Sequence, residues 1–305
     1  MKIRAIVNLR AGLAAHRALD AMAAGRPSWP AIEVRLTEGP AHAIALAREA
    51  VEDEAALVLA AGGDGTVNEV AIALIGTGVP LGIVPVGSGN GLARALGLPL
   101  RPDRALAALE TGIPRRMDVG RINGKPFLNV AGVGFDAFVG WAFHKVGCRG
   151  GRRGIFTYVQ MSLRMLSLYQ ARPVTLELGG ERFCSRPFVL AFANGPQYGA
   201  GAVLNPGAKL NDGRVELVIY EDGPFLETLL LAPRLFLGGI ERSRRYRRLL
   251  VDRATLTAPQ PVEHHRDGEP EPEAARLEVE VVPKALRIVV PRATAEDPAG
   301  PFLPG

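Results

Sequence analysis

The sequence predicts an α/β domain with a parallel sheet, followed by a β-sandwich-like domain. Apolar strand-like runs alternate with runs of helical spacing up to about residue 118, whereas short β-like segments separated by Gly, Pro, Asn and Asp dominate the rest. With 305 residues, 48% of them hydrophobic, the chain is long enough for two buried cores. We therefore expect domains at residues 1–120 and 121–292, and a tail at 293–305 that is weakly ordered or lies across the first domain.

In the first domain the strand-like runs are IRAIVN, AALVLAA and PLGIVPV. Helix-like runs separate and follow them: AHAIALAREAV, VNEVAIALI, GLARALG and PDRALAALETG. This βαβα order predicts a parallel sheet with helices on its faces, and such sheets bind ligands beyond the carboxyl ends of their strands.

The second domain is predicted from its β-like segments. They are PVTLELGG, RPFVLAFAN, GRVELVIYE, RRLLVDRATLTA, RLEVEVVP and ALRIVV. An amphipathic helix at about 154–170 and an apolar run at 225–240 interrupt them.

Charge and composition narrow the class of partner. A net charge of +5 favours contact with something anionic, such as nucleotide phosphates or an acidic membrane surface. We find no zinc-ligand spacing, RNP-like aromatic motif or helix-turn-helix, so no nucleic-acid partner is expected. The apolar runs are too short or too interrupted for a transmembrane segment, and two cysteines without a CxxC pattern suit a reducing compartment. We therefore expect a cytoplasmic protein that meets membranes only peripherally.

The stretch AALVLAAGGDGTVNEVAIALI, residues 55–75, passes from a strand-like run through GGDGT into a helix-like run. Backbone N–H groups and the positive end of a helix dipole converge at such a turn, so it suits a phosphate. The turn lacks the GK[ST] ending of a P-loop, and NLRAG at residues 8–12 lacks the GxGxxG of a dinucleotide fold. A tight turn with positive φ is the simpler explanation of an isolated GGxG.

Asp64, inside that turn, changes the interpretation. A carboxylate beside a phosphate is repelled unless Mg²⁺ or a hydrogen-bond network lies between them, so Asp64 indicates a metal-nucleotide site. A second glycine turn follows the next strand-like run, in IVPVGSGNGLARALGLP at residues 83–99. There Ser88 and Asn90 can add side-chain hydrogen bonds. We expect the two turns to converge on one cleft.

GGDGTVNEV followed by PVGSGNGLAR resembles the diacylglycerol kinase catalytic domain family, which includes bacterial lipid kinases and sphingosine kinases. NLRAG resembles the first nucleotide-binding turn of the family, usually NPxSG, from which Leu9 and Ala11 depart. The resemblance implies a fold like that of NAD kinase and diacylglycerol kinase, with the active site between the two domains. The ATP-binding residues that it implies are Asn8, Gly12, Thr37, Gly62, Gly63, Asp64, Gly65, Thr66, Asn68, Gly87, Ser88, Gly89, Asn90 and Glu269.

The resemblance also implies catalytic roles for three acids. In the bacterial enzymes the Asp of the DGE motif is the proposed general base, which is Asp267 in HHRDGEP. Asp64 and Asp118, the latter in MDVG, would then organise water and Mg²⁺. In the sphingosine kinase branch the base is instead the Asp of the glycine turn, here Asp64, and the sequence leaves this choice open.

The NDG element at residues 211–213 resembles a structural Mg²⁺ site of the family. Asp212 and the backbone carbonyls of Lys209 and Arg214 would supply its ligands. A simpler alternative is that NDG forms a type I′ hairpin turn.

Taken together, the resemblance implies an ATP- and Mg²⁺-dependent kinase that phosphorylates a hydroxyl of a diacylglycerol-like or sphingoid lipid. The second turn reads GSGNGLAR rather than GTxNDFAR, so Gly91 replaces an acid and the identity of the lipid stays open. A NAD kinase-like phosphotransferase and a non-catalytic nucleotide- or lipid-binding regulator remain alternatives.

The expected partner is a lipid presented at a membrane surface, and a homodimer is left open. Two basic clusters could attract anionic headgroups. They contain Arg149, Arg152 and Arg153, and Arg242, Arg244, Arg245, Arg247 and Arg248.

Overall fold

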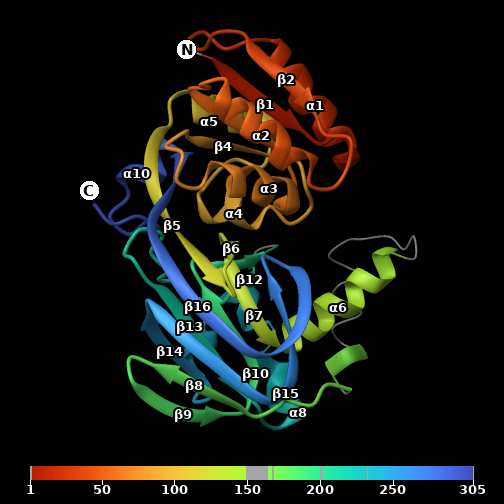
Figure 1. Ribbon diagram of the computed structural model, residues 1–305, viewed down its shortest axis with the longest axis vertical. Coiled ribbons are helices and arrows are strands. Elements are labelled where there is room, and N and C mark those ends of the chain that lie inside the picture. The colour runs from red at the N-terminus through yellow and green to blue at the C-terminus, as the bar shows by residue number, and fades with distance from the viewer. Residues whose placement is uncertain (1, 149–163, 167, 200–201, 232, 305) are drawn as a thin grey trace. The chain divides into compact units, whose positions relative to one another are not determined.

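The computed structural model describes residues 2–304 except 149–163, 167, 200–201 and 232 (Figure 1). The chain divides into two compact units. Unit 1 contains Met1–Val119, Lys209–Asp212 and Pro283–Gly305, and unit 2 contains Gly120–Ala208 and Gly213–Val282. This division differs from the contiguous ranges expected from the sequence. Two long strands, β5 (Ile113–Ile122) and β16 (Glu269–Val290), each contribute residues to both units, so neither unit is a single stretch of chain.

Unit 1 is built on a parallel sheet. Its strand order is β2 (Ile32–Leu36), β1 (Ile3–Val7), β3 (Leu57–Gly62), β4 (Leu81–Pro85) and the end of β16. Every residue of β1, β3 and β4 is buried, as expected for central strands of a sheet covered on both faces. The predicted βαβα order is therefore confirmed.

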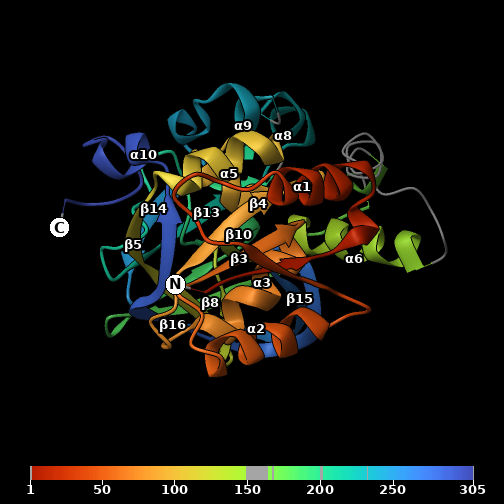
Figure 2. The ribbon, with the colours of Figure 1, turned by 90° about the horizontal axis from the view of Figure 1, so that it is seen from above.

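Helices cover both faces of this sheet. In Figure 2, α1 (Leu13–Ala23) and α5 (Pro102–Glu110) lie on one face, and α2 (His42–Glu52) and α3 (Asp64–Leu74) lie on the other. Each helix buries an apolar stripe, such as Ala105, Leu106 and Leu109 of α5. Shorter helices complete the unit: η1 (Leu9–Ala11), α4 (Gly91–Ala95) and α10 (Arg292–Glu296).

Unit 2 is antiparallel and β-rich. Its main path runs β14 (Tyr246–Val251), β13 (Val215–Glu221), β10 (Pro187–Ala193), β7 (Val130–Gly134), β15 (Arg253–Arg266) and β16. Its shorter strands are β6 (Lys125–Phe127), β8 (Val174–Leu178), β9 (Glu181–Ser185), β11 (Gln197–Gly199) and β12 (Ala202–Val203). A cluster that includes Phe127, Phe192, Leu217 and Leu256 forms the core.

The helical segments of unit 2 depart in part from the sequence pattern. The structure places α6 at Phe135–Cys148, whereas most of the helix expected at 154–170 lies outside the described residues. The apolar run at 225–240 forms α8 (Phe225–Leu231), α9 (Arg234–Leu237) and the start of η2 (Ile240–Arg242). No helix among the described residues is long and apolar enough to cross a membrane.

The C-terminal tail belongs to unit 1. Phe302 is only 2% exposed, and the backbone of Leu303 exchanges hydrogen bonds with the side chain of Asn211. In addition, the backbone N–H of Leu210 donates to the carbonyl of Pro301 at 2.7 Å. The tail is therefore anchored by a buried aromatic ring and by hydrogen bonds to the 209–212 segment.

Candidate functional site

The first glycine turn joins β3 to α3 and is fixed by a small polar contact. The hydroxyl of Thr66 accepts a hydrogen bond from the Asn8 side chain at 3.0 Å, and the backbone N–H of Asn8 donates to Ala61 at 2.9 Å. A Cβ atom on Gly62 would lie 2.3 Å from the Cβ of Thr66, so only glycine fits there. Asn8, Gly62 and Thr66, which were predicted separately, are thus brought together.

The second glycine turn joins β4 to α4 and is closed by Asn90. The Asn90 backbone has a φ of 52°, in the left-handed region. Its side chain accepts from the N–H of Gly87 at 3.0 Å and donates to the carbonyl of Gly87 at 2.7 Å. The Asn90 side chain, expected to be available to a phosphate, is therefore used to shape the turn, whereas Ser88 is exposed.

The two turns pack directly against each other within unit 1. A Cβ atom on Gly87 would approach the Cα of Gly63 to 2.5 Å, so the two backbones meet at glycine. The carboxylate of Asp64 completes the contact, because its Oδ1 accepts from the N–H of Gly91 at 2.7 Å. Since Gly91 is the first residue of α4, the acid of one turn caps the helix that follows the other.

The ionisation of Asp64 is set by two opposing effects. Burial raises the pKa of its carboxyl group, and hydrogen bonds from the backbone N–H groups of Gly91, Asn90 and Leu92 lower it; the net pKa is raised. The hydrogen-bond network that an acid needs in this position is therefore supplied in part by the protein backbone itself.

The remaining predicted ATP-binding residues of unit 1 lie around these turns. Gly12 has a φ of 73° and precedes α1, and the N–H of Thr37 donates to Val7 at 2.9 Å. Gly65 and Asn68 lie on α3.

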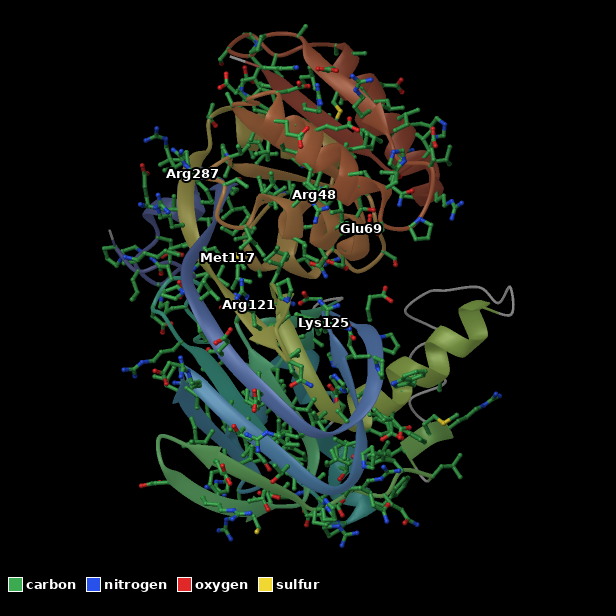
Figure 3. The ribbon with its side chains drawn as sticks, in the orientation of Figure 1. Arg48, Glu69, Met117, Arg121, Lys125 and Arg287 are labelled. Carbon is green, nitrogen blue, oxygen red and sulfur yellow. The ribbon has the colours of Figure 1, made fainter. Side chains whose placement is uncertain are left out.

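Glu69 was missed in the sequence, although it belongs to the GDGTVNE run. It lies on α3 (labelled in Figure 3), and its carboxylate accepts from the N–H groups of Ala41 at 3.0 Å and Ala43 at 3.2 Å. It thereby caps the N-terminus of α2 and holds the loop that carries Thr37. An acid three residues after a glycine turn could have suggested a cap, but its target is distant in sequence.

Asp118 is fully buried in β5. Its carboxylate accepts from the backbone N–H of Lys284 at 2.6 Å, and its own N–H donates to Leu210 at 2.7 Å. It therefore joins three segments of unit 1. Its expected role in organising water and Mg²⁺ stays a prediction.

The predicted metal ligands Lys209, Asp212 and Arg214 lie in the segment before β13. The Lys209 ammonium group contacts the carbonyl of Gly300. The alternative of a hairpin turn at NDG is wrong, because the partner of Val215 in the sheet is Val251 on β14. Within the described residues no group of three or more His, Cys, Asp or Glu could hold a metal. One carboxylate with two carbonyl oxygens nevertheless suits Mg²⁺, which retains several waters.

Asp267 and Gly268 form the turn between β15 and β16, where Arg266 pairs with Glu269. Both have positive φ, 48° and 84°, as a type I′ turn requires. The Asp267 carboxylate accepts from three consecutive backbone N–H groups, those of Leu128, Asn129 and Val130, at 2.8, 2.8 and 3.0 Å. Its own N–H donates to Val130 at 2.7 Å. Asp267 therefore holds the segment that leads into β7 through four hydrogen bonds.

Burial raises the pKa of Asp267, and the three backbone hydrogen bonds act in the opposite direction; the net pKa is raised. Asp267 consequently takes up a proton more readily than an exposed aspartate. Three N–H donors occupy three of the lone-pair positions of the two oxygens, which leaves one on Oδ2.

A buried histidine–aspartate pair lies beside this turn, and the sequence did not predict it. Nε2 of His265 lies 2.7 Å from Oδ2 of Asp136, and the two side chains are only 3% and 9% exposed. The N–H of Gly268 donates to Nδ1 of His265 at 3.3 Å, so the proton of a neutral ring lies on Nε2 and points to Asp136. His265 thus links α6 to the turn that presents Asp267. Neighbouring histidines gave no metal-ligand spacing, and only the tertiary structure reveals the pair.

Ion pairs stabilise the same hairpin next to its turn. Glu271 is 7% exposed and accepts from Lys125 (labelled in Figure 3) at 2.6 Å and from Arg266 at 2.7 Å. Glu269, predicted to bind ATP, is the first residue of β16 and is exposed.

Comparison with known families and relatives agrees with these features. Residues 2–122 match the family described as the diacylglycerol kinase catalytic domain, and residues 129–290 match the YegS C-terminal NAD kinase beta sandwich-like domain. A relative named "Probable lipid kinase YegS-like" from Pseudomonas putida is 33% identical over 272 residues, which cover 87% of this chain and 88% of the relative. One of the same name from Pseudomonas aeruginosa is 34% identical over 277 residues, covering 89% and 88%.

Solved structures give the same fold. The crystal structure of a diacylglycerol kinase from Bacillus anthracis has a TM-score of 0.75 at 19% identity, covering 96% of this chain and 97% of that one. An NAD kinase from Archaeoglobus fulgidus in complex with ATP has a TM-score of 0.53 at 13% identity, covering 95% and 94%. The predicted fold class is confirmed, and the chain belongs to the YegS family of diacylglycerol kinase-like lipid kinases.

Proposed function

We propose that this protein is an ATP- and Mg²⁺-dependent lipid kinase that phosphorylates a hydroxyl of a diacylglycerol-like or sphingoid lipid. The observation that carries the proposal is the contact of the two glycine turns through Asp64 and Gly91. This contact groups the ends of the parallel strands β3 and β4 with the starts of α3 and α4, where backbone donors suit phosphates. Family membership supplies the reaction class.

In this proposal the residues around the turns of unit 1 bind the nucleotide. ATP, when bound, supplies the phosphoryl group, and Mg²⁺ neutralises charge on its phosphates. Glycines at 62, 63, 87 and 89 let the backbone approach closely, Asn8 and Asn90 fix the shapes of the turns, and Ser88 is exposed to add a donor. Further proposed contacts of the nucleotide are Gly12, Thr37, Gly65, Thr66, Asn68 and Glu269.

The proton of the acceptor hydroxyl is proposed to pass to Asp267. As the lipid oxygen bonds to the terminal phosphorus, the bond to the leaving ADP oxygen breaks and the hydroxyl proton moves to the carboxylate. A raised pKa and a remaining lone-pair position on Oδ2 support this role. Asp64 is the alternative base, but its Oδ1 is used in capping α4. Asp64 is therefore better suited to hold the turns and a hydrated Mg²⁺.

We further propose that the segment with Lys209, Asp212 and Arg214 holds a second, structural Mg²⁺. Its oxygen donors fit a hard cation. The contacts of this segment with the tail, through Leu210 and Asn211, offer a way for the ion to stabilise unit 1.

The decisive experiment is transfer of labelled γ-phosphate from ATP, with and without Mg²⁺. Acceptors are mixed micelles of diacylglycerol, monoacylglycerol, phosphatidylglycerol, sphingosine or ceramide, and NAD in a separate reaction. Asp267→Asn is compared with Asp252→Asn, a matched change at an exposed aspartate of unit 2. We expect one labelled lipid, lost only in Asp267→Asn. Label on NAD alone would support the NAD kinase-like alternative, and ATP binding without any labelled acceptor would support a non-catalytic regulator.

A further inference from the structure

The connection between β13 and β14 is much longer than the sheet requires. These strands are antiparallel neighbours, paired from Val215 with Val251 to Tyr220 with Tyr246, and a turn of a few residues could join them. Instead, the connection contains α8, α9 and η2, the first two seen together in Figure 2. A long connection with its own helices usually serves a purpose beyond closing the sheet.

α8 exposes leucines and buries a polar residue, although its acidic residue Glu227 is exposed as usual. Its polar residue Thr228 is 8% exposed, and its hydroxyl accepts from Arg245 at 3.1 Å. Leu226 and Leu230, one helical turn apart, are 64% and 67% exposed. A surface helix normally buries its leucines and exposes its polar residues. Within the part of the chain that the structure describes, Leu226 and Leu230 therefore remain open to solvent.

Exposed apolar side chains continue along the connection. Phe225 precedes Leu226 and is 53% exposed, and Leu237 on α9 is 85% exposed. Single exposed leucines need no explanation, but a group of large apolar side chains on one segment marks an interaction surface. We call Phe225, Leu226, Leu230 and Leu237 the α8–α9 apolar surface.

Arginines on the same connection divide into two groups. Arg245 is held inside unit 2, where it donates to the carbonyl of Glu221 at 2.8 Å and its guanidinium carbon lies 4.6 Å from the centre of the Tyr220 ring. In contrast, Arg234, Arg242 and Arg244 are exposed and make no ion pair with any described residue. The other predicted basic cluster, at residues 149–153, lies outside the described residues.

We propose that the α8–α9 apolar surface docks on the headgroup and upper acyl region of an anionic lipid bilayer, with Arg234, Arg242 and Arg244 contacting lipid phosphates. Exposed apolar side chains and three exposed arginines on one connection match such a surface in polarity and charge, although the exposed Glu227 opposes it. A second copy of the chain fits less well, because a twofold contact of this surface with itself would bring the same arginines together. The proposal rests on the proposed function, since an enzyme that acts on a lipid needs contact with the bilayer that carries it.

The test is co-sedimentation of the full chain with vesicles of phosphatidylcholine, with or without phosphatidylglycerol, at low and high salt. The variants are Leu226→Asp/Leu230→Asp and Arg234→Ser/Arg242→Ser/Arg244→Ser. The matched control is Leu100→Asp, at an exposed leucine of unit 1. Circular dichroism checks folding, and kinase activity on a short-chain diacylglycerol in detergent micelles provides a readout independent of the bilayer.

We expect the wild type and the control to bind phosphatidylglycerol vesicles more tightly at low salt. The leucine variant should lose roughly tenfold or more in affinity, and the arginine variant should lose its salt dependence, while both keep micellar activity. Equal vesicle binding by all proteins, or conversion of a dimer into a monomer by the leucine variant without a loss of vesicle binding, would overturn the proposal. Vesicle binding without activity on any acceptor would refute the proposed function and leave this surface intact.

Discussion

Oδ1 of Asp64 lies 2.7 Å from the backbone nitrogen of Gly91, so the acid of the first glycine turn caps the helix of the second. This hydrogen bond explains why an acid occupies a turn that otherwise suits a phosphate. Its negative charge lies at the positive end of a short helix, and the two turns are held as one surface.

Replacing Asp64 should separate its two proposed roles. Asp64→Ala removes the cap and should lower the free energy of unfolding by about 1 kcal/mol, a usual cost of losing such a residue. Asp64→Asn retains an acceptor oxygen and should keep most of that stability, yet lose Mg²⁺-dependent transfer because the charge is gone. Urea unfolding and initial rates at several Mg²⁺ concentrations measure the two effects. Full activity of Asp64→Asn would exclude a role for its charge.

The close approach of the two turns can be tested at a single glycine. Gly87→Ala places a Cβ about where the Cα of Gly63 requires space, and should cost roughly 1–3 kcal/mol of stability together with ATP affinity. Gly65→Ala is the control for stability, because its Cβ meets no atom within 4 Å and Gly65 lies in α3. Urea denaturation and ATP titration compare them. Equal stability of the two variants would show that the turns can separate freely.

Two substitutions can test the two hydrogen bonds of His265 separately. His265→Asn places an acceptor near the position of Nδ1 and loses the donor to Asp136, whereas His265→Gln retains a donor near Nε2 and loses the acceptor for Gly268. We expect His265→Asn to lower stability by about 1–3 kcal/mol, since a buried carboxylate loses its donor. His265→Gln should mainly lower kcat, with an unchanged KM for ATP. Identical effects of both variants on stability and kcat would argue against this division of roles.

Activity should be lost at a higher pH than it would be if Asp267 had the pKa of an ordinary aspartate. Only the ionised carboxylate of Asp267 can accept a proton, so activity falls as pH falls through its pKa, and burial raises that pKa. The acid limb of kcat/KM should therefore have its midpoint above about 4, the usual value for aspartate. The limb should persist in any residual activity of Asp64→Asn, since the pKa of Asp64 is raised as well. Loss of the limb in that variant would assign it to Asp64.

The proposed structural Mg²⁺ site predicts a ligand-dependent melting temperature. Mg²⁺ should raise the melting temperature of the wild type by on the order of a few degrees, and EDTA should reverse this shift. Asp212→Ala should abolish the response, whereas Asp252→Ala should keep it. Differential scanning fluorimetry without nucleotide measures this stabilisation apart from catalysis. An unchanged response in Asp212→Ala would remove the metal from this segment.

Local patterns in the sequence were enough to predict the parallel sheet, both glycine turns, the DGE element and the family. Strand and helix periodicity are properties of neighbouring residues, and a glycine that permits a close backbone approach is visible as a letter. The sequence does not show that the two compact units share strands. The long strands β5 and β16 contribute to both units, and no local signal shows where such a strand changes its neighbours.

The partners of polar side chains were decided only by the tertiary structure. Asp64 meets Gly91, Asp267 meets Leu128 to Val130, and His265 meets Asp136 across separations that no pattern in the sequence specifies. Asp118, equally acidic in the sequence, is buried between backbone segments, and Asn90 closes its own turn. A residue type limits which hydrogen bonds a side chain can make, but the packing of distant segments determines which bond forms and which group remains for chemistry.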